Sequence, residues 1–172
     1  AVFNLDKLDW MNGHYIRELS HEDLADALLE YWRHHPPSEI PKLSDRDFLL
    51  KIVPLIQKRL KTLTDAAPLI PFFFQDEVDY DSAELVQKGM DAPGTKHALE
   101  VALTELSGLS SFETEALEGL LRPLSKELNV KVGQLFGSLR VATTGLRVSP
   151  PLFETMEVLG RERTLASIKK AI

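Results

Sequence analysis

The sequence predicts an all-α fold composed of two small helical subdomains. Apolar residues recur at spacings of three and four along most of the chain, which is the period of an amphipathic helix. Segments rich in Pro, Gly, Ser and Asp separate these runs, and strand signals are almost absent. Asn12-Gly13, a frequent hairpin turn, is flanked by helical spacing instead. The 172 residues, 44% of them hydrophobic and 27% charged, have the composition of a folded globular protein.

Serine caps mark the two clearest helices of the first subdomain. Ser20 begins a capping-box-like segment with an acidic residue at the fourth place, and Pro36-Pro37 ends the apolar run that follows. Ser44 is the expected cap of the next helix, which should continue to Leu60. Pro54 should kink that helix because proline lacks a backbone donor and crowds the preceding turn.

A turn-rich stretch, residues 75–82, is the expected hinge to the second subdomain. Further helices should begin near Ser82, Thr95, Glu113, Lys131 and Pro150. Ser149 suits an N-cap because proline at 150 suits the first helical position. Gly160 suits a C-terminal cap before a last short helix over residues 162–171.

Charge is unevenly distributed along this acidic chain, whose net charge is −6. Residues 76–118 hold 11 acids and 2 lysines, a net charge of −9, whereas residues 51–61 and 128–153 hold no acid. The cations of these acid-free runs are Lys51, Lys58, Arg59 and Lys61, and then Lys131, Arg140 and Arg147. The net charge argues against non-specific coating of nucleic acid or a basic membrane patch, but a local basic face suits RNA phosphates. A buried helix with a polar loop explains the same runs, so both interpretations stay open.

Motifs for catalysis and metal binding are missing from the sequence. Without cysteine there are no disulfides, thiol nucleophiles or Cys-based zinc sites. No HExxH motif, glycine-rich phosphate loop or nucleophile elbow occurs. The acids at 76–81 lack the glycine and glutamate of a calcium loop. Most aromatic residues have core spacing, and nothing selects the one or two that would stack on bases. We therefore expect no metal site and no catalytic residue.

The chain shows neither a membrane-spanning segment nor a conventional start. No apolar run approaches the ~20 residues that cross a bilayer. Because the sequence begins at Ala1 rather than at methionine, we expect either a processed chain or a piece of a longer protein.

Three segments carry a recognisable pattern. The first, residues 3–18, contains Trp10-Met-Asn-Gly13 followed by Tyr15-Ile-Arg17, and the second is Arg59-Leu-Lys-Thr62-Leu63. The third, residues 129–160, contains Lys131-Val-Gly-Gln134, Leu139-Arg140-Val-Ala-Thr-Thr-Gly145, Ser149-Pro150 and Leu159-Gly160. In order and spacing, essentially the whole chain resembles the C-terminal region of bacterial glutamyl-tRNA synthetases, which are class I enzymes. It departs from the usual pattern at Phe112, Ser138 and Pro151.

The resemblance implies a role for each part of the chain. Residues 1–18 would end the stem-contact region, and residues 19–75 and 76–172 would be two helical anticodon-binding subdomains. The family's HIGH and KMSKS motifs are absent here, so the catalytic domain would lie upstream, and we expect this chain alone to be inactive. The full-length enzyme, a glutamate–tRNA ligase, would use ATP and Mg²⁺, with no cofactor in this chain. The partner would be tRNA(Glu), not DNA or a membrane, and the protein a cytoplasmic monomer.

The resemblance also implies which residues recognise the anticodon: Arg59, Arg140, Ser149, Pro150, Pro151 and Leu152. Arginine offers a planar fork of donors that suits base-edge acceptors, and anticodon bases are unpaired and accessible. Lys58, Lys61, Lys131 and Arg147 are candidate contacts to the RNA backbone. Alternatively, Arg59 is a surface arginine at a helix end, and Arg140 is packed along a helix.

A helical protein-interaction module is the competing interpretation. It would dock a partner through the acidic residues 76–118. If RNA is the partner, we expect its contacts on residues 51–61 and 128–153, away from that acidic segment.

Overall fold

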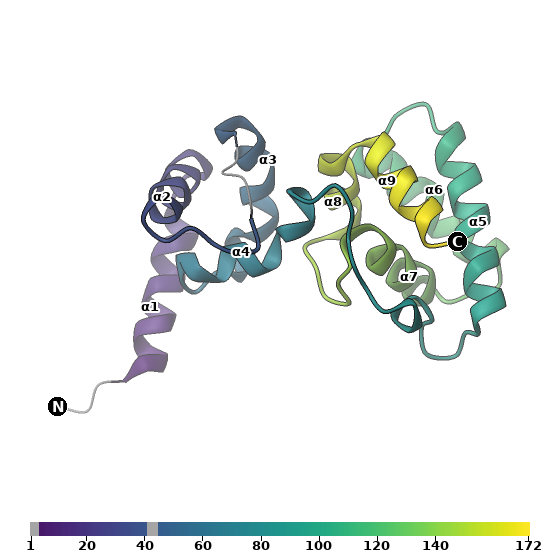
Figure 1. Cartoon of the computed structure of the whole chain (residues 1–172), viewed down its shortest axis with the longest axis horizontal. Coiled ribbons are helices and arrows are strands. Elements are labelled where there is room, and N and C mark those ends of the chain that lie inside the picture. Colours follow the sequence, from purple (N-terminus) through teal and green to yellow (C-terminus); the bar gives the residue numbers. More distant parts are fainter. Residues whose placement is uncertain (1–3, 41–44) are drawn as a thin grey trace. The chain divides into compact units, whose positions relative to one another are not determined.

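Helices form all the regular structure of the computed structural model, which describes residues 4–40 and 45–172 (Figure 1). This confirms the all-α prediction. Residues 1–3 and 41–44, which include the expected cap Ser44, lie outside the described residues. The chain divides into two compact units, Ala1–Gln75 and Asp76–Ile172. The division falls where the sequence placed the limit between its two subdomains, whereas their functional roles stay predictions.

The first unit contains four α-helices and three short 3₁₀ helices among its described residues. These are α1 (Leu5–Glu18), α2 (His21–His34), α3 (Arg46–Ile56), η1 (Gln57–Arg59), η2 (Leu63–Asp65), α4 (Ala66–Leu69) and η3 (Pro71–Phe73). Helices α2 and α3 pack together, and the indole of Trp32 on α2 is buried. The expected cap is confirmed at Ser20, whose Oγ accepts a 3.0 Å hydrogen bond from the Asp23 amide.

Helix α3 differs from its prediction at both ends. Its N-cap is Asp45, whose carboxylate accepts a hydrogen bond from the Asp47 amide at 3.2 Å. The predicted extension to Leu60 was wrong, because α3 ends at Ile56 and the chain continues as η1. Pro54 gives no amide hydrogen to the last turn, so that turn is weakened where the 3₁₀ segment takes over.

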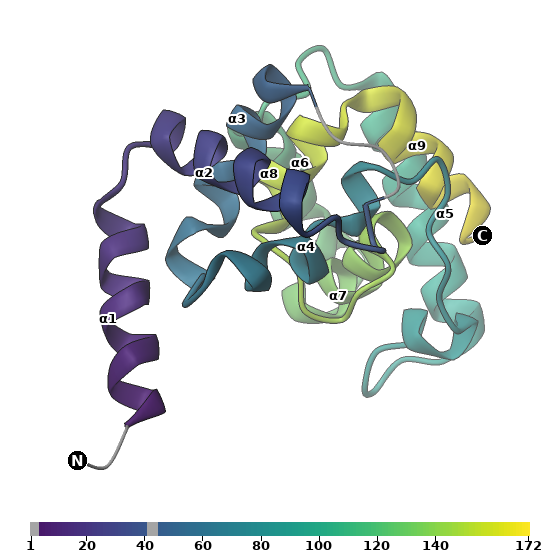
Figure 2. The ribbon, with the colours of Figure 1, turned by 60° about the vertical axis from the view of Figure 1, so that its left-hand side comes forward.

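The second unit surrounds its own hydrophobic core. Its elements are η4 (Ser82–Leu85), α5 (Ala92–Gly108), α6 (Thr114–Glu127), α7 (Val132–Thr144), α8 (Leu152–Leu159) and α9 (Arg161–Lys170). Helices α5, α7 and α9 contact one another (Figures 1 and 2). The core includes the fully buried side chains of Leu99, Leu139 and Ile168.

Two helix starts of this unit agree with the sequence. The starts near Glu113 and Lys131 are confirmed, because these residues are the N-caps of α6 and α7. Gly160 is confirmed as the C-cap of α8, with φ +81°.

The other three predicted starts agree less closely with the structure. A helix does begin at Ser82, but it is a four-residue 3₁₀ helix. Helix α5 begins before Thr95 because the Asp91 carboxylate accepts from the Gly94 amide at 2.8 Å. Helix α8 begins two residues after Pro150, and Ser149 does not cap it: the Ser149 hydroxyl donates to the Pro150 carbonyl at 3.0 Å.

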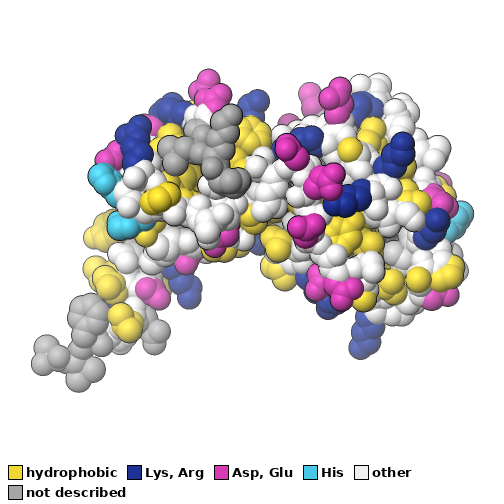
Figure 3. All heavy atoms as spheres, viewed as in Figure 1, with side chains coloured by type: hydrophobic (Ala, Val, Ile, Leu, Met, Phe, Trp, Pro, Cys, Tyr) yellow, Lys and Arg dark blue, Asp and Glu magenta, His cyan; other side chains and the backbone are white. Residues whose placement is uncertain are grey.

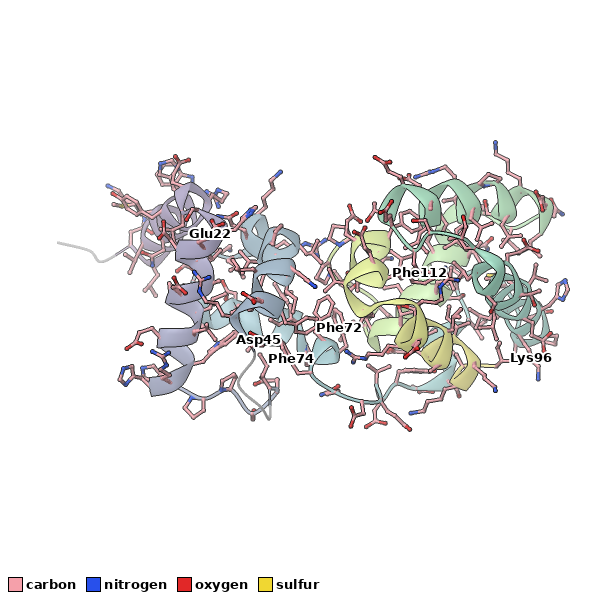
Figure 4. The ribbon with its side chains drawn as sticks, turned by 90° about the horizontal axis from the view of Figure 1, so that it is seen from above. Glu22, Asp45, Phe72, Phe74, Lys96 and Phe112 are labelled. Atoms are coloured by element: carbon pink, nitrogen blue, oxygen red, sulfur yellow. The ribbon has the colours of Figure 1, made fainter. Side chains whose placement is uncertain are left out.

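Side chains from α8 and α9 complete the ends of α5 and α6. The Glu157 carboxylate accepts a 2.6 Å hydrogen bond from the Thr114 amide at the start of α6. The Arg161 guanidinium donates to the carbonyls of Leu106 at 3.2 Å and of Leu109 at the end of α5. Its Cζ lies 5.2 Å from the ring centroid of Phe112, which Figure 4 shows beside the ribbon of α8 and α9. These contacts satisfy backbone groups that a helix end leaves without intrahelical partners.

None of the described helices combines the length and apolar character needed to cross a membrane.

Candidate nucleic-acid interface

The turn that carries Arg59 is held in place by its neighbour in the sequence. Gln57 is 8% exposed, and its Nε2 donates to the carbonyls of Ile16 at 2.9 Å and Leu19 at 2.8 Å. Lys58 and Arg59 are exposed. Within residues 4–40 and 45–172, no carboxylate forms an ion pair with either cation. The turn therefore presents two available cations from an anchored backbone.

The chain after this turn is also anchored. The Asp65 carboxylate accepts from the amides of Lys61 at 2.9 Å and Thr62 at 2.8 Å. Lys61 is exposed and lines a hollow of about 290 Å³. The other lining residues, Asp9, Trp10 and Arg17, all belong to α1. Lys58, Arg59 and Lys61 thus belong to one ordered segment.

Helix α1 exposes an aromatic surface that the sequence did not single out. Apolar side chains gather over α1 in Figure 3. Trp10 is 67% exposed and Tyr15 is 63% exposed, although core spacing favoured burial. The Trp10 and His14 rings are stacked, with centroids 5.9 Å apart and planes 6° apart. Spacing alone could not find this surface, because it does not reveal which helix face lacks a neighbour.

The predicted site in the second unit combines the end of α7 with the following turn. Arg140 is half-buried, and its carbonyl accepts a 2.7 Å hydrogen bond from the Thr144 hydroxyl. Gly145 ends α7 with φ +70°, and a Cβ there would lie 2.9 Å from the Asp79 carbonyl oxygen. Only glycine fits both the left-handed conformation and this close approach.

The four predicted residues of the turn differ in exposure. Ser149 and Leu152 are each 4% exposed, Pro150 is buried, and Pro151 is exposed. Leu152 also belongs to the hydrophobic core. An RNA contact at this turn would therefore use the Pro151 side chain and the local backbone, rather than the side chains of Ser149 and Leu152.

The acid-free stretch lies against part of the acidic segment. The Arg147 Nε is 3.5 Å from the Glu84 Oε1, and the Ser138 hydroxyl donates to the Leu85 carbonyl at 2.7 Å. The acid-free and acidic segments are therefore neighbours at these contacts, because η4 packs against α7. Where RNA binds stays a prediction. Sequence charge counts cannot detect such a contact between segments more than 50 residues apart.

Lys131 lies at the opposite end of α7 from the predicted turn. The helix has 13 residues, so at 1.5 Å per residue its ends are about 20 Å apart. Lys131 is exposed, and the Gln134 side chain accepts from its amide at 2.8 Å.

No group of three His, Asp or Glu side chains suited to a metal ion occurs in the described part of the chain. Each unit instead carries candidate cations on short segments: Lys58, Arg59 and Lys61 in the first, and Lys131, Arg140 and Arg147 in the second. Such cations suit RNA phosphates and base-edge acceptors.

This arrangement is that of a helical RNA-binding domain, and comparison with known proteins identifies the family. Residues 23–172 match the family model described as "Anticodon binding domain", and the chain belongs to this family. It is 45% identical over 172 residues to a glutamate–tRNA ligase of Dehalococcoides mccartyi, covering 100% of this chain and 36% of that protein. It is also 45% identical over 177 residues to a glutamate–tRNA ligase of Roseiflexus castenholzii, covering 100% and 34%.

The chain thus spans about a third of the length of these curated relatives and matches their C-terminal part. Its fold is similar to that in the crystal structure of a glutamate tRNA ligase from Elizabethkingia meningosepticum. That likeness has a TM-score of 0.80 at 23% sequence identity, and covers 98% of this chain and 32% of that one.

Proposed function

We propose that this chain is the anticodon-reading part of a glutamate–tRNA ligase and that its partner is tRNA(Glu). The relatives that match it along its whole length at 45% identity carry that enzyme's name, which supports the proposal. Aminoacylation would take place in the part of the protein outside this chain, where ATP and Mg²⁺ bind. This chain needs no cofactor, has no catalytic activity alone, and acts in a monomeric cytoplasmic enzyme.

Each part of the chain has a proposed role in docking the tRNA. Residues 1–18 end the stem-contact region, and residues 19–75 and 76–172 are the two anticodon-binding subdomains. Arg140 and the turn from Ser149 to Leu152 contact anticodon bases. Lys58, Lys61, Lys131 and Arg147 contact the RNA backbone. Binding energy from these contacts favours productive placement of the distant acceptor end.

The observation that carries the proposal is the exposed guanidinium of Arg59 on the turn that Gln57 anchors. Arg59 reads the last anticodon base, which is C in glutamate tRNAs and G in glutamine tRNAs. A guanidinium only donates hydrogen bonds. Cytosine offers the acceptors O2 and N3, whereas the same edge of guanine presents the donors N1–H and N2–H₂ beside its acceptors. Arg59 therefore favours cytosine.

Binding of short RNAs tests the proposal. The 172-residue chain would be mixed with a tRNA(Glu) anticodon stem–loop, with the same RNA carrying G at the last anticodon position, and with an unrelated stem–loop. We expect the tightest binding to the first RNA. Its log–log salt slope should be about −0.7 for each single-stranded phosphate contacted. Equal affinities for the three RNAs, or no binding, would contradict the proposal, and no binding would favour the protein-interaction module.

The proposed division of labour has its own test. The purified chain should show no glutamate-dependent exchange between ATP and pyrophosphate. Measurable exchange would place a catalytic centre in this chain and contradict the assignment.

A further inference from the structure

Three lysines from separate segments line one hollow at the start of α7. They are Lys88, in the turn after η4, Lys126, in the last turn of α6, and Lys131, the N-cap of α7. The hollow has a volume of about 910 Å³. Its other lining residues are Gly89, Asn129, Val130 and Gln134. We call it the lysine pocket.

The side chain of Gln134 joins two walls of the lysine pocket. Its Oε1 accepts from the Lys131 amide at 2.8 Å, and its Nε2 donates to the Lys88 carbonyl at 2.9 Å. Gly89 has φ +86°, and a Cβ there would lie 3.2 Å from the Gln134 Nε2. The turn can therefore approach Gln134 closely because residue 89 is glycine. One side chain thus holds together two backbone segments that are more than 40 residues apart.

The third wall is fixed by the end of α6. Asn129 takes a left-handed conformation with φ 54°, and its amide donates to the Lys126 carbonyl at 3.0 Å. The Val130 amide donates to the Ser125 carbonyl at 2.9 Å. These bonds end the helix in a defined turn and set the backbone of Lys126 relative to that of Lys131.

The lysine pocket has an excess of positive charge. Its lining contains three lysines and no acid. In the part of the chain that the structure describes, none of these lysines forms an ion pair. The acids near the pocket lie outside its lining: Glu127 is next to Lys126 in the sequence, and Asp91 lines an adjoining hollow and caps α5. Glu115 and Glu118 line another hollow that shares Lys126, and Glu118 pairs with Arg122. Three available cations around one concavity of an acidic chain raise the local concentration of anions.

We propose that the lysine pocket binds backbone phosphate of the tRNA, as a contact about 20 Å along α7 from the predicted anticodon turn. This inference rests on the proposed function. Lysine is a compact point charge that suits phosphate oxygens without fixing a base. The lining offers three ammonium groups and a single aliphatic side chain, Val130, which favours phosphate over an acidic peptide. Lys88 then contacts RNA although it belongs to the acidic segment 76–118.

The decisive variant replaces all three lysines with glutamine in the 172-residue chain. Binding to a full tRNA(Glu) transcript would be measured from low to moderate salt. We expect at least a threefold loss of affinity at ~0.1 M salt and a log–log slope shallower by ~0.7 to ~2, for one to three phosphates lost. The preference for C over G at the last anticodon base should be unchanged, because the pocket reads no base.

Lys96→Gln is the matched control. Lys96 lies on α5 and is not part of the pocket lining, and Figure 4 shows it at the outer edge of the ribbon. It lies 3.9 Å from Glu100, so its replacement should leave affinity and slope at the wild-type values. If the triple variant also keeps the wild-type affinity and salt slope, the proposal that the lysine pocket binds phosphate is overturned. The proposed function would still stand in that case, provided that the wild-type chain discriminates between C and G at the last anticodon base. A wild-type chain that binds no tRNA would overturn both.

A second measurement locates the contact without altering the lysines. Adding tRNA should shift the NMR signals of the Gly89 amide and of the Gln134 side-chain amide. Shifts confined to the Arg59 turn and the turn after α7 would overturn the pocket, even if the triple variant bound weakly because its fold had changed.

Discussion

The side-chain amide of Gln57 donates a 2.9 Å hydrogen bond to the backbone carbonyl of Ile16, which lies 41 residues earlier in the chain. The same nitrogen donates to the Leu19 carbonyl at 2.8 Å. Because Lys58 and Arg59 follow directly, the end of α1 determines where these two cations lie. The geometry of the proposed contact between Arg59 and a base therefore depends on α1, although α1 takes no part in that contact.

Replacing Gln57 with leucine should destabilise the first unit. The variant leaves two backbone carbonyls without their donor, which should lower the free energy of unfolding by about 1–3 kcal/mol. Urea unfolding followed by Trp32 fluorescence in a Trp10→Phe background reports on this unit, because both tryptophans of the chain lie in it. Lys58→Ala, at the exposed neighbour, should stay within about 0.5 kcal/mol of the parent. An unchanged urea midpoint for Gln57→Leu would mean that the hydrogen bonds of Gln57 contribute nothing to the stability of the first unit.

Arg59→Gln should narrow the preference for C over G at the last anticodon base. Glutamine carries both a donor and an acceptor and can reorient to suit either base. Opposed buried donors cost on the order of 1–3 kcal/mol, so removing that penalty against G should reduce the affinity ratio roughly tenfold. The two stem–loops above provide the measurement. The control is Arg33→Gln, which replaces an exposed arginine paired with Glu30. This variant should keep the wild-type ratio of affinities for the C and G stem–loops. If both variants behave alike, Arg59 is only a surface arginine.

Glu84→Gln should strengthen RNA binding by releasing Arg147. The pair is largely exposed, with side-chain exposures of 67% for Arg147 and 36% for Glu84, so its loss should change stability by less than about 1 kcal/mol. The freed guanidinium should steepen the salt slope by up to ~0.7. The double variant with Arg147→Ala should show no such gain. A gain that persists in the double variant would assign the effect to the general loss of negative charge.

The ion pair between Glu77 and Lys170 should be visible in an acid titration. The hydrogen bond from Lys170, 2.7 Å long, lowers the pKa of Glu77 below its ordinary value of 4.5, and the lysine charge adds to this effect. A lowered pKa stabilises the folded state fully above pH 4.5, and this contribution is lost as the pH falls through the folded value. Carboxyl NMR should show the Glu77 pKa rising in Lys170→Gln but not in Lys169→Gln. Equal midpoints in wild type and Lys170→Gln would show that the pair does not form in solution.

Local signals made most of the fold predictable. The Ser20 cap and the Gly160 C-cap depend on interactions within one helical turn, and the structure confirms both. The start of α5 was missed because Ala-Pro-Gly after Asp91 has the composition of a turn, although Asp91 caps a helix there. The start of α8 was missed because Ser149 uses its hydroxyl on the Pro150 carbonyl instead of on a helix amide.

The candidate site was predictable only in part. The resemblance selected Arg59, but the sequence does not reveal that Gln57 anchors its turn, because the accepting carbonyls lie about 40 residues away. Likewise, the Gln134 side chain links the backbones of Lys88 and Lys131, which lie 43 residues apart in the sequence. The exposure of Trp10 depends on which face of α1 lacks a neighbour, and residue spacing does not contain that information.

The capping of α5 and α6 by Arg161 and Glu157 affects the order of folding during synthesis. The ribosome makes both helices before the residues that complete their ends, and the core residue Ile168 comes later still. The first unit has all its residues once position 75 has been made, and domains fold as units from the N-terminus. The second unit can reach its final structure only when the last helix has emerged. A chain that stops before residue 157 would therefore carry a folded first unit followed by two helices with open ends and an incomplete core.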